Sequence, residues 1–584
     1  MAAARLSHVT AARAGATRGE RGAGERVAPG GRRAGDAAGS PFCQGLGKRY
    51  QASLAAQVFC RGVQPHEPSG PGARAPAAGH RVPGAPGNVD AASPAEDVGP
   101  GGLRAYGQSE VSIGASGKYV IEAWNDATGV FAACPSPKAQ FTGFGFSSNG
   151  GSSFTDLQGL PDARCSQYLY LGDPSVVAYR AGGRSYFYIS SMFDAVSGAG
   201  RSFVALAACQ VTGSAGRSAL HCSQPIIAGA SSQCQGRVCS FLDKDYLAID
   251  PAHGRLFAAF TEFGFTDAGA VEASVCDLGT PAGRAGPAGG TPAAPVCKHG
   301  TGLHPVGANK LAGKPYLTIQ QPDPGGCEYE GAYPAADTAT GDLYVGYEYN
   351  WATSVVALQC RNSPRVRNIM AKVPRRCLAL RMVSPCAGPA ARASVPITSM
   401  FAANLPGYNR SPNDFPRLAV SDQAGTVTMV WNDAGLHPYG DVLLQSFTLA
   451  SLRPVQARPV ALDVPHRGGL TFMPAVRTAT AAGLLDVTWY SRDAVTTSDT
   501  VVKAALGVSP RAARTPAANL TITTVPSNWD DQISDIAPNF GDYTDNALDA
   551  TSTIPYVGGT LYVAWTDGRA GVPQPFEAHL PAGR

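Results

Sequence analysis

The sequence predicts an all-β protein, a six- or seven-bladed β-propeller with seven blades favoured, over residues 101–584. Three observations predict this fold: Gly and Pro supply 69 and 46 of the 584 residues, only 15% of residues are charged, and one hairpin signature recurs along the chain. Such a composition excludes a coiled coil or a long helical bundle, in which Ala, Glu, Lys and Leu dominate. No apolar run reaches the roughly 18 residues of a membrane-spanning helix, so we expect no membrane span.

The first hundred residues differ from the rest of the chain. They are rich in Ala, Gly, Arg and Pro, and they hold too little apolar surface to offset the entropy lost on ordering, so we predict a disordered leader over 1–100. The leader has 12 basic and 7 acidic residues, whereas 101–584 has 35 and 36. An RNA-binding tail is the alternative interpretation, but the arginines are dispersed and aromatic residues are scarce. The nearly neutral body gives no electrostatic reason to bind nucleic acid.

Cysteine usage indicates an oxidising compartment. Twelve of the 14 cysteines lie between Cys134 and Cys386, and neither a CxxC nor an HxxxH zinc spacing occurs. We therefore expect disulfides that close blade insertions, with the neighbouring cysteines at 209 and 222 and at 234 and 239 as examples. An extracellular or cell-envelope location follows from this expectation.

The N-terminal residues point the other way, because no apolar stretch typical of a secretory signal follows Met1. One hypothesis reconciles the two signals: the true translation start lies downstream of Met1. Mass spectrometry of the native N-terminus tests it, and a peptide covering Arg5 to Arg33 would contradict it.

One strand signature recurs from residue 108 onward. Each copy has a Gly-containing turn, an apolar strand of about five residues, and then an aromatic residue followed by polar or acidic residues. The copies lie at 116–126, 183–189 (a weaker one), 254–262, 341–348, 425–433, 483–490 and 559–567. Seven copies spaced roughly 60–90 residues apart fit a propeller whose blades carry long insertions, and six blades result if the weak copy is an insertion.

A second segment precedes the turn in most copies, so each unit is a strand, a Gly turn and a strand. These approach segments lie at 173–178, 245–250, 333–337, 415–420 and 473–476. They are apolar on both faces, as expected of sheets that stack face to face. A pair of β-sandwich domains is the alternative, but it would not require one motif at a fixed place in every unit.

The segment 146–154 resembles the Asp-box of the sialidase-like propellers, Ser-x-Asp-x-Gly-x-Thr-Trp. Ser147 and Gly151 match the motif, whereas Asn149 replaces its Asp and Phe154 its Trp. The motif is a turn in which an Asx side chain bonds its own backbone and Gly residues take positive φ. With the runs 539–545 and 563–569, the whole of 108–584 resembles secreted bacterial sialidase-like repeat proteins. In that family the Asp-box marks the fold and lies away from the catalytic face.

The resemblance implies a particular chemistry: three arginines that grip a substrate carboxylate, a Tyr nucleophile assisted by a Glu, and an Asp acid/base. The family's first arginine belongs to an Arg-Ile-Pro motif in blade one, which is missing from 108–113. Arg417, Arg492 and Arg569 lie at comparable strand ends and are the candidates for convergence on the axis. Their alternative role is that of solvated loop residues paired with nearby Asp.

A carboxylate-rich stretch near the C-terminus is a second candidate site. It contains Asp530, Asp531, Asp535, Asp542 and Asp545. Two of these, Asp542 and Asp545, are the candidates for general acid/base work, and the stretch could also supply oxygen ligands for Ca²⁺. No EF-hand spacing is present, and solvated turn residues are the alternative. We expect no other cofactor or metal.

Aromatic residues at strand ends are a third candidate. Trp124, Tyr347, Trp431, Trp489 and Trp565 occupy one position in successive copies. If Trp124, Trp431 and Trp565 faced the channel mouth, they would form a stacking platform for sugar rings. Core packing would produce the same recurrence.

Two function classes follow from these features. The first is a secreted, non-catalytic, monomeric sialidase-like propeller that binds carbohydrate or a cell-surface protein through its loop face. The second is an exo-acting glycoside hydrolase of the exo-α-sialidase type. The two differ in whether arginines gather with a Tyr–Glu pair at the axis, and a structural cell-surface scaffold would have neither a pocket nor a soluble ligand.

Overall fold

The structure is a computed structural model that describes residue 60 and, with gaps, residues 86–583. The longer stretches left out within that range are 98–106, 279–294, 298–316, 350–365, 379–390, 397–404, 531–538 and 550–558. In the described part, no helix is long and apolar enough to cross a membrane.

Apart from one two-stranded hairpin, the described strands form seven antiparallel sheets, which are the seven blades of a propeller. The first blade contains β2 (Gln108–Ser116), β3 (Tyr119–Asp126), β4 (Thr142–Ser147) and β5 (Thr155–Gly159); the second contains β7 (Ser175–Ala181), β8 (Arg184–Ala195), β9 (Phe203–Thr212), β10 (Ala219–Cys222) and β11 (Ile226–Ala230), with β6 (Tyr168–Tyr170) beside β8. The third blade contains β14 (Phe241–Asp250), β15 (Arg255–Phe263), β16 (Gly269–Asp277), β17 (Val296–Cys297) and β18 (Leu317–Gln320); the fourth contains β19 (Tyr329–Ala336), β20 (Leu343–Tyr349), β21 (Arg367–Val373) and β22 (Ala391–Pro396); the fifth contains β23 (Arg417–Ser421), β24 (Thr426–Asp433), β25 (Asp441–Thr448) and β26 (Val460–Ala461). The sixth blade contains β27 (Leu470–Thr478), β28 (Leu485–Arg492), β29 (Asp499–Val508), β30 (Leu520–Thr521) and β31 (Ser527–Asn528), and the seventh contains β32 (Asp545–Leu548), β33 (Thr560–Asp567), β34 (Gln574–Pro581) and β1 (Val89–Asp90). Short elements outside the blades are β12 (Cys234–Gln235), β13 (Val238–Cys239), the helix α3 (Ala127–Phe131) and the 3₁₀ turn η2 (Arg375–Leu378).

The predicted fold is confirmed, and the blade number is seven rather than six. The weak copy at 183–189 falls in β8, which pairs with β7 as the first hairpin of the second blade. Each repeated signature is the turn between the two innermost strands of a blade. A left-handed backbone at that turn explains the recurrent Gly, since six of the seven turn glycines have positive φ (Gly117, Gly183, Gly254, Gly341, Gly425 and Gly483).

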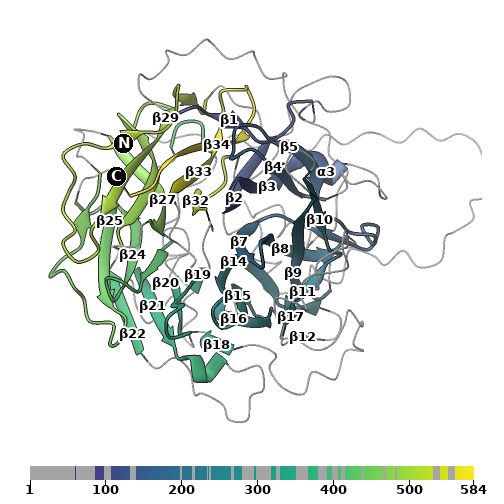
Figure 1. The fold of residues 1–584 in the computed structure, drawn as a ribbon, viewed down its shortest axis with the longest axis horizontal. Helices are drawn as coiled ribbons and strands as arrows, with labels where there is room; N and C mark the ends of the chain where they lie inside the picture. The colour runs from purple at the N-terminus through teal and green to yellow at the C-terminus, as the bar shows by residue number, and fades with distance from the viewer. Residues whose placement is uncertain are drawn as a thin grey trace, which may run out of the picture. The chain divides into compact units, whose positions relative to one another are not determined.

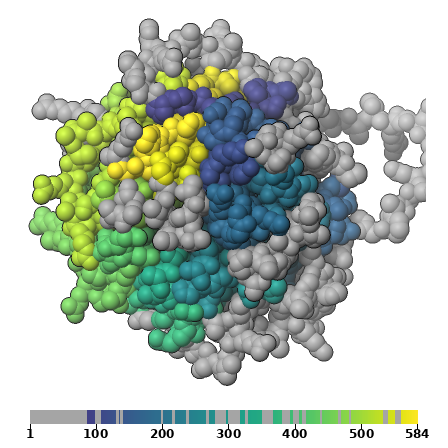
Figure 2. All heavy atoms as spheres, in the orientation of Figure 1, coloured from purple at the N-terminus to yellow at the C-terminus, as the bar shows by residue number. Residues whose placement is uncertain are grey.

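The innermost strands form a closed ring in the order β2, β7, β14, β19, β23, β27, β32 and back to β2, each in contact with the next (Figure 1). The last blade is completed by the earliest described strand, since Val89 and Asp90 of β1 pair with Glu577 and Phe576 of β34. Figure 2 shows the consequence, with the yellow C-terminal residues packed beside the purple and blue N-terminal ones. The strand β1 thus completes the last blade, although it falls within the stretch 1–100 that was predicted as a leader. Residues 1–85, apart from Cys60, lie outside the described residues.

Apolar side chains fill the space between successive blades. One buried cluster lies at each of the seven blade interfaces, for example Ile121, Phe187 and Ala207 between the first two blades and Val430, Val487 and Trp489 between the fifth and sixth. This packing explains why the strands are apolar on both faces. The innermost strands of the seven blades leave a narrow channel along the axis.

Among the described residues, four disulfides have both partners placed, and they confirm the prediction made from the cysteines. Cys209–Cys222 joins β9 to β10, Cys234–Cys239 closes the β12–β13 hairpin, and Cys276–Cys297 joins β16 to β17. Cys134–Cys165 is the fourth. Bonds of this kind indicate that the chain matures in an oxidising environment.

Candidate functional site

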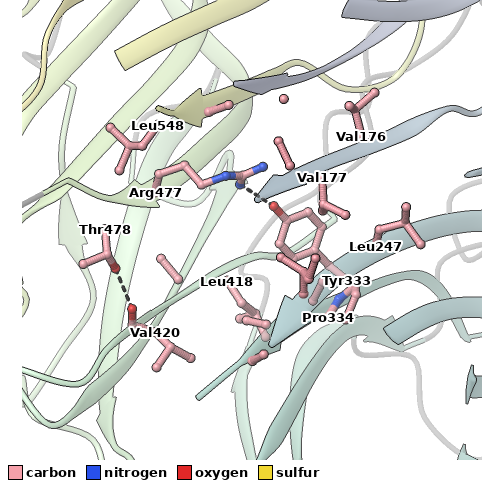
Figure 3. A pocket seen from close by; sticks show the side chains of 18 of the residues that line it. Val176, Val177, Leu247, Tyr333, Pro334, Leu418, Val420, Arg477, Thr478 and Leu548 are labelled. Carbon is pink, nitrogen blue, oxygen red and sulfur yellow. Dashed lines mark hydrogen bonds between the residues drawn. The ribbon is translucent and has the colours of Figure 1, made fainter. Parts of the chain in front are cut away.

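A cavity of about 80 Å³ lies on the propeller axis and is lined by residues from all seven innermost strands. Most of these residues are apolar, and many are alanine. The polar ones are Tyr333, Arg477 and Thr478, and Figure 3 shows Arg477 reaching toward Tyr333. Pockets for small molecules commonly have volumes of about 300–1,000 Å³, so this channel is too narrow to take a sugar ring.

The two ends of the channel differ. We call the end where the innermost strands begin the mouth. The hairpin at 146–154, which resembles an Asp-box, lies at the opposite end of the channel. The strand register shows this, because Ser147 pairs with Val120, and Val120 pairs with Ala115 near the end of β2. Ligands that reach the mouth therefore do not meet that hairpin.

Irregular backbone marks the mouth in most blades. Register shifts interrupt β2, β14, β19 and β27 just after they begin. Residues at this position have positive φ: Glu110, Asp173, Lys244, Gly331, Met473 and Gly541. A bulge changes the direction in which a side chain points. Positive φ costs a non-Gly residue of order 1–3 kcal/mol, and such strain is typical of functional sites. Because the charged residues Glu110, Asp173 and Lys244 have positive φ here, we take the mouth as the candidate site.

Lys244 is the centre of a buried ion cluster at the mouth. Its Nζ lies 2.8 Å from Asp542 Oδ2, 3.0 Å from Asp173 Oδ2 and 3.7 Å from Glu110 Oε1. Asn125 ties two of these acids together, since its Nδ2 donates to Glu110 and its Oδ1 accepts from the backbone N–H of Asp173. The ammonium group thus lies between three carboxyl groups. Among the described residues, no group of His, Cys, Asp and Glu is arranged to hold a metal ion.

Burial controls protonation in this cluster. It raises the pKa of Glu110 well above the usual range, and the carboxylate of Asp173 raises it further. Burial and Asp173 likewise raise the pKa of Asp243 to about 8. Burial also opposes the charge on Asp173, but the Lys244 ammonium outweighs it and lowers that pKa. At neutral pH the cluster therefore combines a charged Lys244–Asp173 pair with acids that keep their protons.

Arg417 lies beside this cluster among three tyrosine rings. Its guanidinium carbon is 4.4, 4.9 and 5.5 Å from the ring centres of Tyr246, Tyr333 and Tyr543, and Nη2 donates to the Tyr246 hydroxyl at 2.7 Å. Arg417 is only 3% exposed. Burial raises the pKa of both Tyr246 and Tyr543 well above the usual range, so these phenols stay neutral at physiological pH.

Asp545 links Ser112 and Arg477 near the axis. Its Oδ2 accepts from Ser112 Oγ at 2.7 Å, and its Oδ1 accepts from Arg477 Nη2 at 2.8 Å. Arg477 also donates to the Tyr333 hydroxyl at 2.5 Å. Of the carboxylate-rich stretch, the structure thus brings Asp542 and Asp545 to the mouth. Asp530 is exposed, and the Asp residues at 531 and 535 lie outside the described residues.

The other two candidate arginines have separate surroundings. Arg492 is fully buried, donates to Thr500 Oγ1 and lies 4.8 Å from the Trp529 ring. Arg569 pairs with Asp567 at 2.6 Å and lies over Phe576. Arg417, Arg492 and Arg569 therefore share no described partner, and Arg417 is the one at the axis.

The recurrent tryptophans lie in the cores between blades. Trp124, Trp431 and Trp565 are each at most 1% exposed and belong to three different interblade clusters. Their ring faces contact protein side chains, so in this structure none presents a stacking surface to solvent.

The 146–154 hairpin has the geometry of an Asx turn. Asn149 Oδ1 accepts from the backbone N–H of Ser153, and the backbone N–H of Gly151 donates to Ser147 Oγ. Gly150 and Gly151 have positive φ, and Phe154 packs against the cluster between the last and first blades. Membership of the Asp-box family stays a prediction.

Sequence reasoning missed Glu110, Asp173, Lys244 and Arg477, together with the tyrosines around Arg417. A signal was present, because the first three are charged residues at the head of successive innermost strands. The approach segments show that position, but their charges were not compared between blades.

Comparisons with known proteins add distant likenesses of fold. No family model and no curated protein matches the sequence. Among solved structures, an α-L-arabinofuranosidase of Fusarium graminearum aligns with 85% of this chain and 98% of its own, at 10% identity and a TM-score of 0.36. A Trypanosoma rangeli sialidase aligns with 71% of this chain and 58% of its own, at 11% identity and a TM-score of 0.34. A Hadza microbial sialidase aligns with 84% of this chain and 68% of its own, at 12% identity and a TM-score of 0.34.

Proposed function

We propose that this protein is a secreted propeller of the sialidase-like type that binds carbohydrate through its mouth face without cleaving it. One observation carries the proposal: the charged groups at the axis are already enclosed by other groups of the protein. Lys244 is enclosed by three acids, Arg477 is held by Asp545, and Arg417 is covered by tyrosine rings. A hydrolase of an anionic sugar needs accessible guanidinium and carboxyl groups around a sugar-sized pocket. The disulfides favour an extracellular or cell-envelope location.

An exo-acting glycoside hydrolase of the sialidase type is the second candidate. It is favoured by Arg417, whose Nη1 is buried without a hydrogen-bond partner among the described residues, as is the hydroxyl of Tyr543. An anionic group bound at these two atoms would satisfy both. Asp243, protonated at neutral pH, could then donate a proton.

The proposal is tested by binding of the labelled full chain, folded under oxidising conditions, to an array of immobilised oligosaccharides. Two exposed apolar residues provide a matched pair of variants: Leu436 (60% exposed) follows β24 at the mouth, and Val296 (71% exposed) lies at the opposite end of its blade. We expect Leu436→Asp to weaken binding and Val296→Asp to leave it unchanged. Equal losses would place the contact elsewhere, and no binding to any oligosaccharide would favour a protein ligand or a structural scaffold instead.

A further inference from the structure

A second recess opens between the third and fourth blades, apart from the axis. This recess, the blade 3–4 groove, has a volume of about 450 Å³ and is lined by Asp323, Tyr329, Tyr349, Arg367, Ile369, Arg392, Ala393 and Ser394. Its volume lies within the range of about 300–1,000 Å³ that is typical of ligand sites.

The strand register shows how the groove is built. Tyr349 pairs with Arg367, Ile369 with Ser394, and Ala371 with Arg392. Because side chains alternate along a strand, Arg367 and Arg392 emerge on the same face of the fourth blade. That face meets the third blade, where the backbone carbonyl of Ile319 accepts a hydrogen bond from Arg392 Nη2 at 3.1 Å. Tyr349 and Arg367 lie at the mouth end of their strands.

The groove offers two cations, Arg367 and Arg392, beside one described acid in its lining, Asp323. Arg367 and Arg392 are exposed, and neither forms an ion pair within the described part of the chain. Their guanidinium groups are planar forks that fit a carboxylate with two parallel hydrogen bonds. Arg392 pairs with Ala371, which is four residues from Arg367 on β21. At about 3.4 Å per residue, the two arginines are therefore about 14 Å apart along the strand direction. This spacing suits a chain with several carboxylates better than one acidic sugar.

Aromatic and hydroxyl groups complete the lining. Tyr349 is half-buried beside Tyr329, with ring centres 5.2 Å apart, and its hydroxyl donates to Asp323 at 3.2 Å. Sugar rings pack their C–H faces on aromatic rings of this kind. The carboxylate of Asp323 and the exposed hydroxyl of Ser394 are groups that bond sugar hydroxyls.

We infer that the blade 3–4 groove binds an acidic oligosaccharide, a chain of uronate sugars, with Arg367 and Arg392 holding its carboxylates and Tyr349 supporting a ring. This inference rests on the proposed carbohydrate binding; it adds a binding place whose mouth end is formed by Tyr349 and Arg367, and it names the class of ligand.

Calorimetric titration of the full chain with trigalacturonate tests the inference, with the fully methyl-esterified trimer as a neutral ligand of the same rings. The double variant Arg367→Gln/Arg392→Gln is compared with Arg180→Gln, an exposed arginine of the second blade. We expect the wild type to prefer the acid over the ester, and the double variant to lose at least about tenfold in affinity for the acid. Arg180→Gln should bind as the wild type does. Raising NaCl from about 0.1 to about 1 M should weaken binding, because it shortens the screening length from about 10 to about 3 Å.

Two results would overturn the groove and leave the proposed function standing: equal affinity of the double variant and the wild type for the acid, or binding of neutral but not acidic oligosaccharides. If neither trimer nor any arrayed oligosaccharide bound, the groove and the proposed function would both fail. Because both arginines are exposed, we expect the double variant to fold as the wild type does. An unchanged melting temperature would show this.

Discussion

Lys244 Nζ lies 2.8 Å from Asp542 Oδ2, although 298 residues separate the two in the chain. The contact joins the third blade to the start of the last one. It forms only once the ring of blades has closed, and it keeps both charges out of water. Removing one partner of a buried ion pair leaves the other uncompensated, which makes the pair a sensitive measure of ring closure.

Lys244→Met should therefore destabilise the protein by about 3–5 kcal/mol, because Asp173 and Asp542 lose their counter-charge. The free energy of unfolding in urea measures this. Lys118→Met, in an exposed turn, is the control and should change stability by no more than about 0.5 kcal/mol. Similar effects of the two changes would show that the cluster does not support the fold.

The closing blade should make stability depend on pH. Burial raises the pKa of Glu577 to about 7, against an unfolded value near 4.5, so its contribution is complete below about pH 4.5 and is lost as the pH rises through 7. Glu122, which faces it, is shifted in the same direction by burial. Glu577→Gln should remove up to about 3 kcal/mol of this pH dependence.

Urea midpoints measured at pH values below 4.5 and above 7 give the comparison for Glu577→Gln. The exposed acid Asp493 offers a control, and Asp493→Asn should keep the wild-type slope. Parallel profiles for the wild type and Glu577→Gln would mean that the carboxyl is not protonated in the fold.

The disulfides should contribute according to the loops that they close. Replacing Cys276 and Cys297 with Ser opens a separation of 21 residues, whereas the Cys234–Cys239 pair spans 5. Loop entropy predicts a loss of about 3 kcal/mol for the first pair and less for the second. Thermal melting of the two double variants checks the order, and a larger loss for Cys234→Ser/Cys239→Ser would contradict it.

Trp431 distinguishes core packing from sugar stacking. Trp431→Ala should cost about 3–5 kcal/mol, because the side chain is fully buried. Trp431→Phe should fold and bind arrayed oligosaccharides as the wild type does. A loss of oligosaccharide binding in the folded Trp431→Phe variant would instead show that the tryptophans form a binding platform for sugar rings.

Local pattern predicted the fold well and the site only in part. The Gly turns recur because each blade repeats one left-handed turn, and this recurrence located six of the hairpins clearly and the weak one at 183–189. The strand Val89–Asp90 was missed, since two residues carry no periodicity and the pairing partner lies at the other end of the chain. Asp542 and Asp545 were selected among five acids, yet burial separates Asp542 from the exposed Asp530, and burial is set by tertiary packing. Lys244 lies at the head of its strand, as Glu110 and Asp173 do in the two preceding blades, but only tertiary packing brings the three acids around it.

The most direct test of the account is hydrolysis of a fluorogenic sialoside by the full chain folded under oxidising conditions, with Arg417→Lys as the companion variant. A binding propeller with a neutralised axis should release no more fluorophore than the heat-denatured protein, in the wild type and the variant alike. Turnover by the wild type that is lost in a folded Arg417→Lys variant would contradict the account and make Arg417 part of a catalytic site.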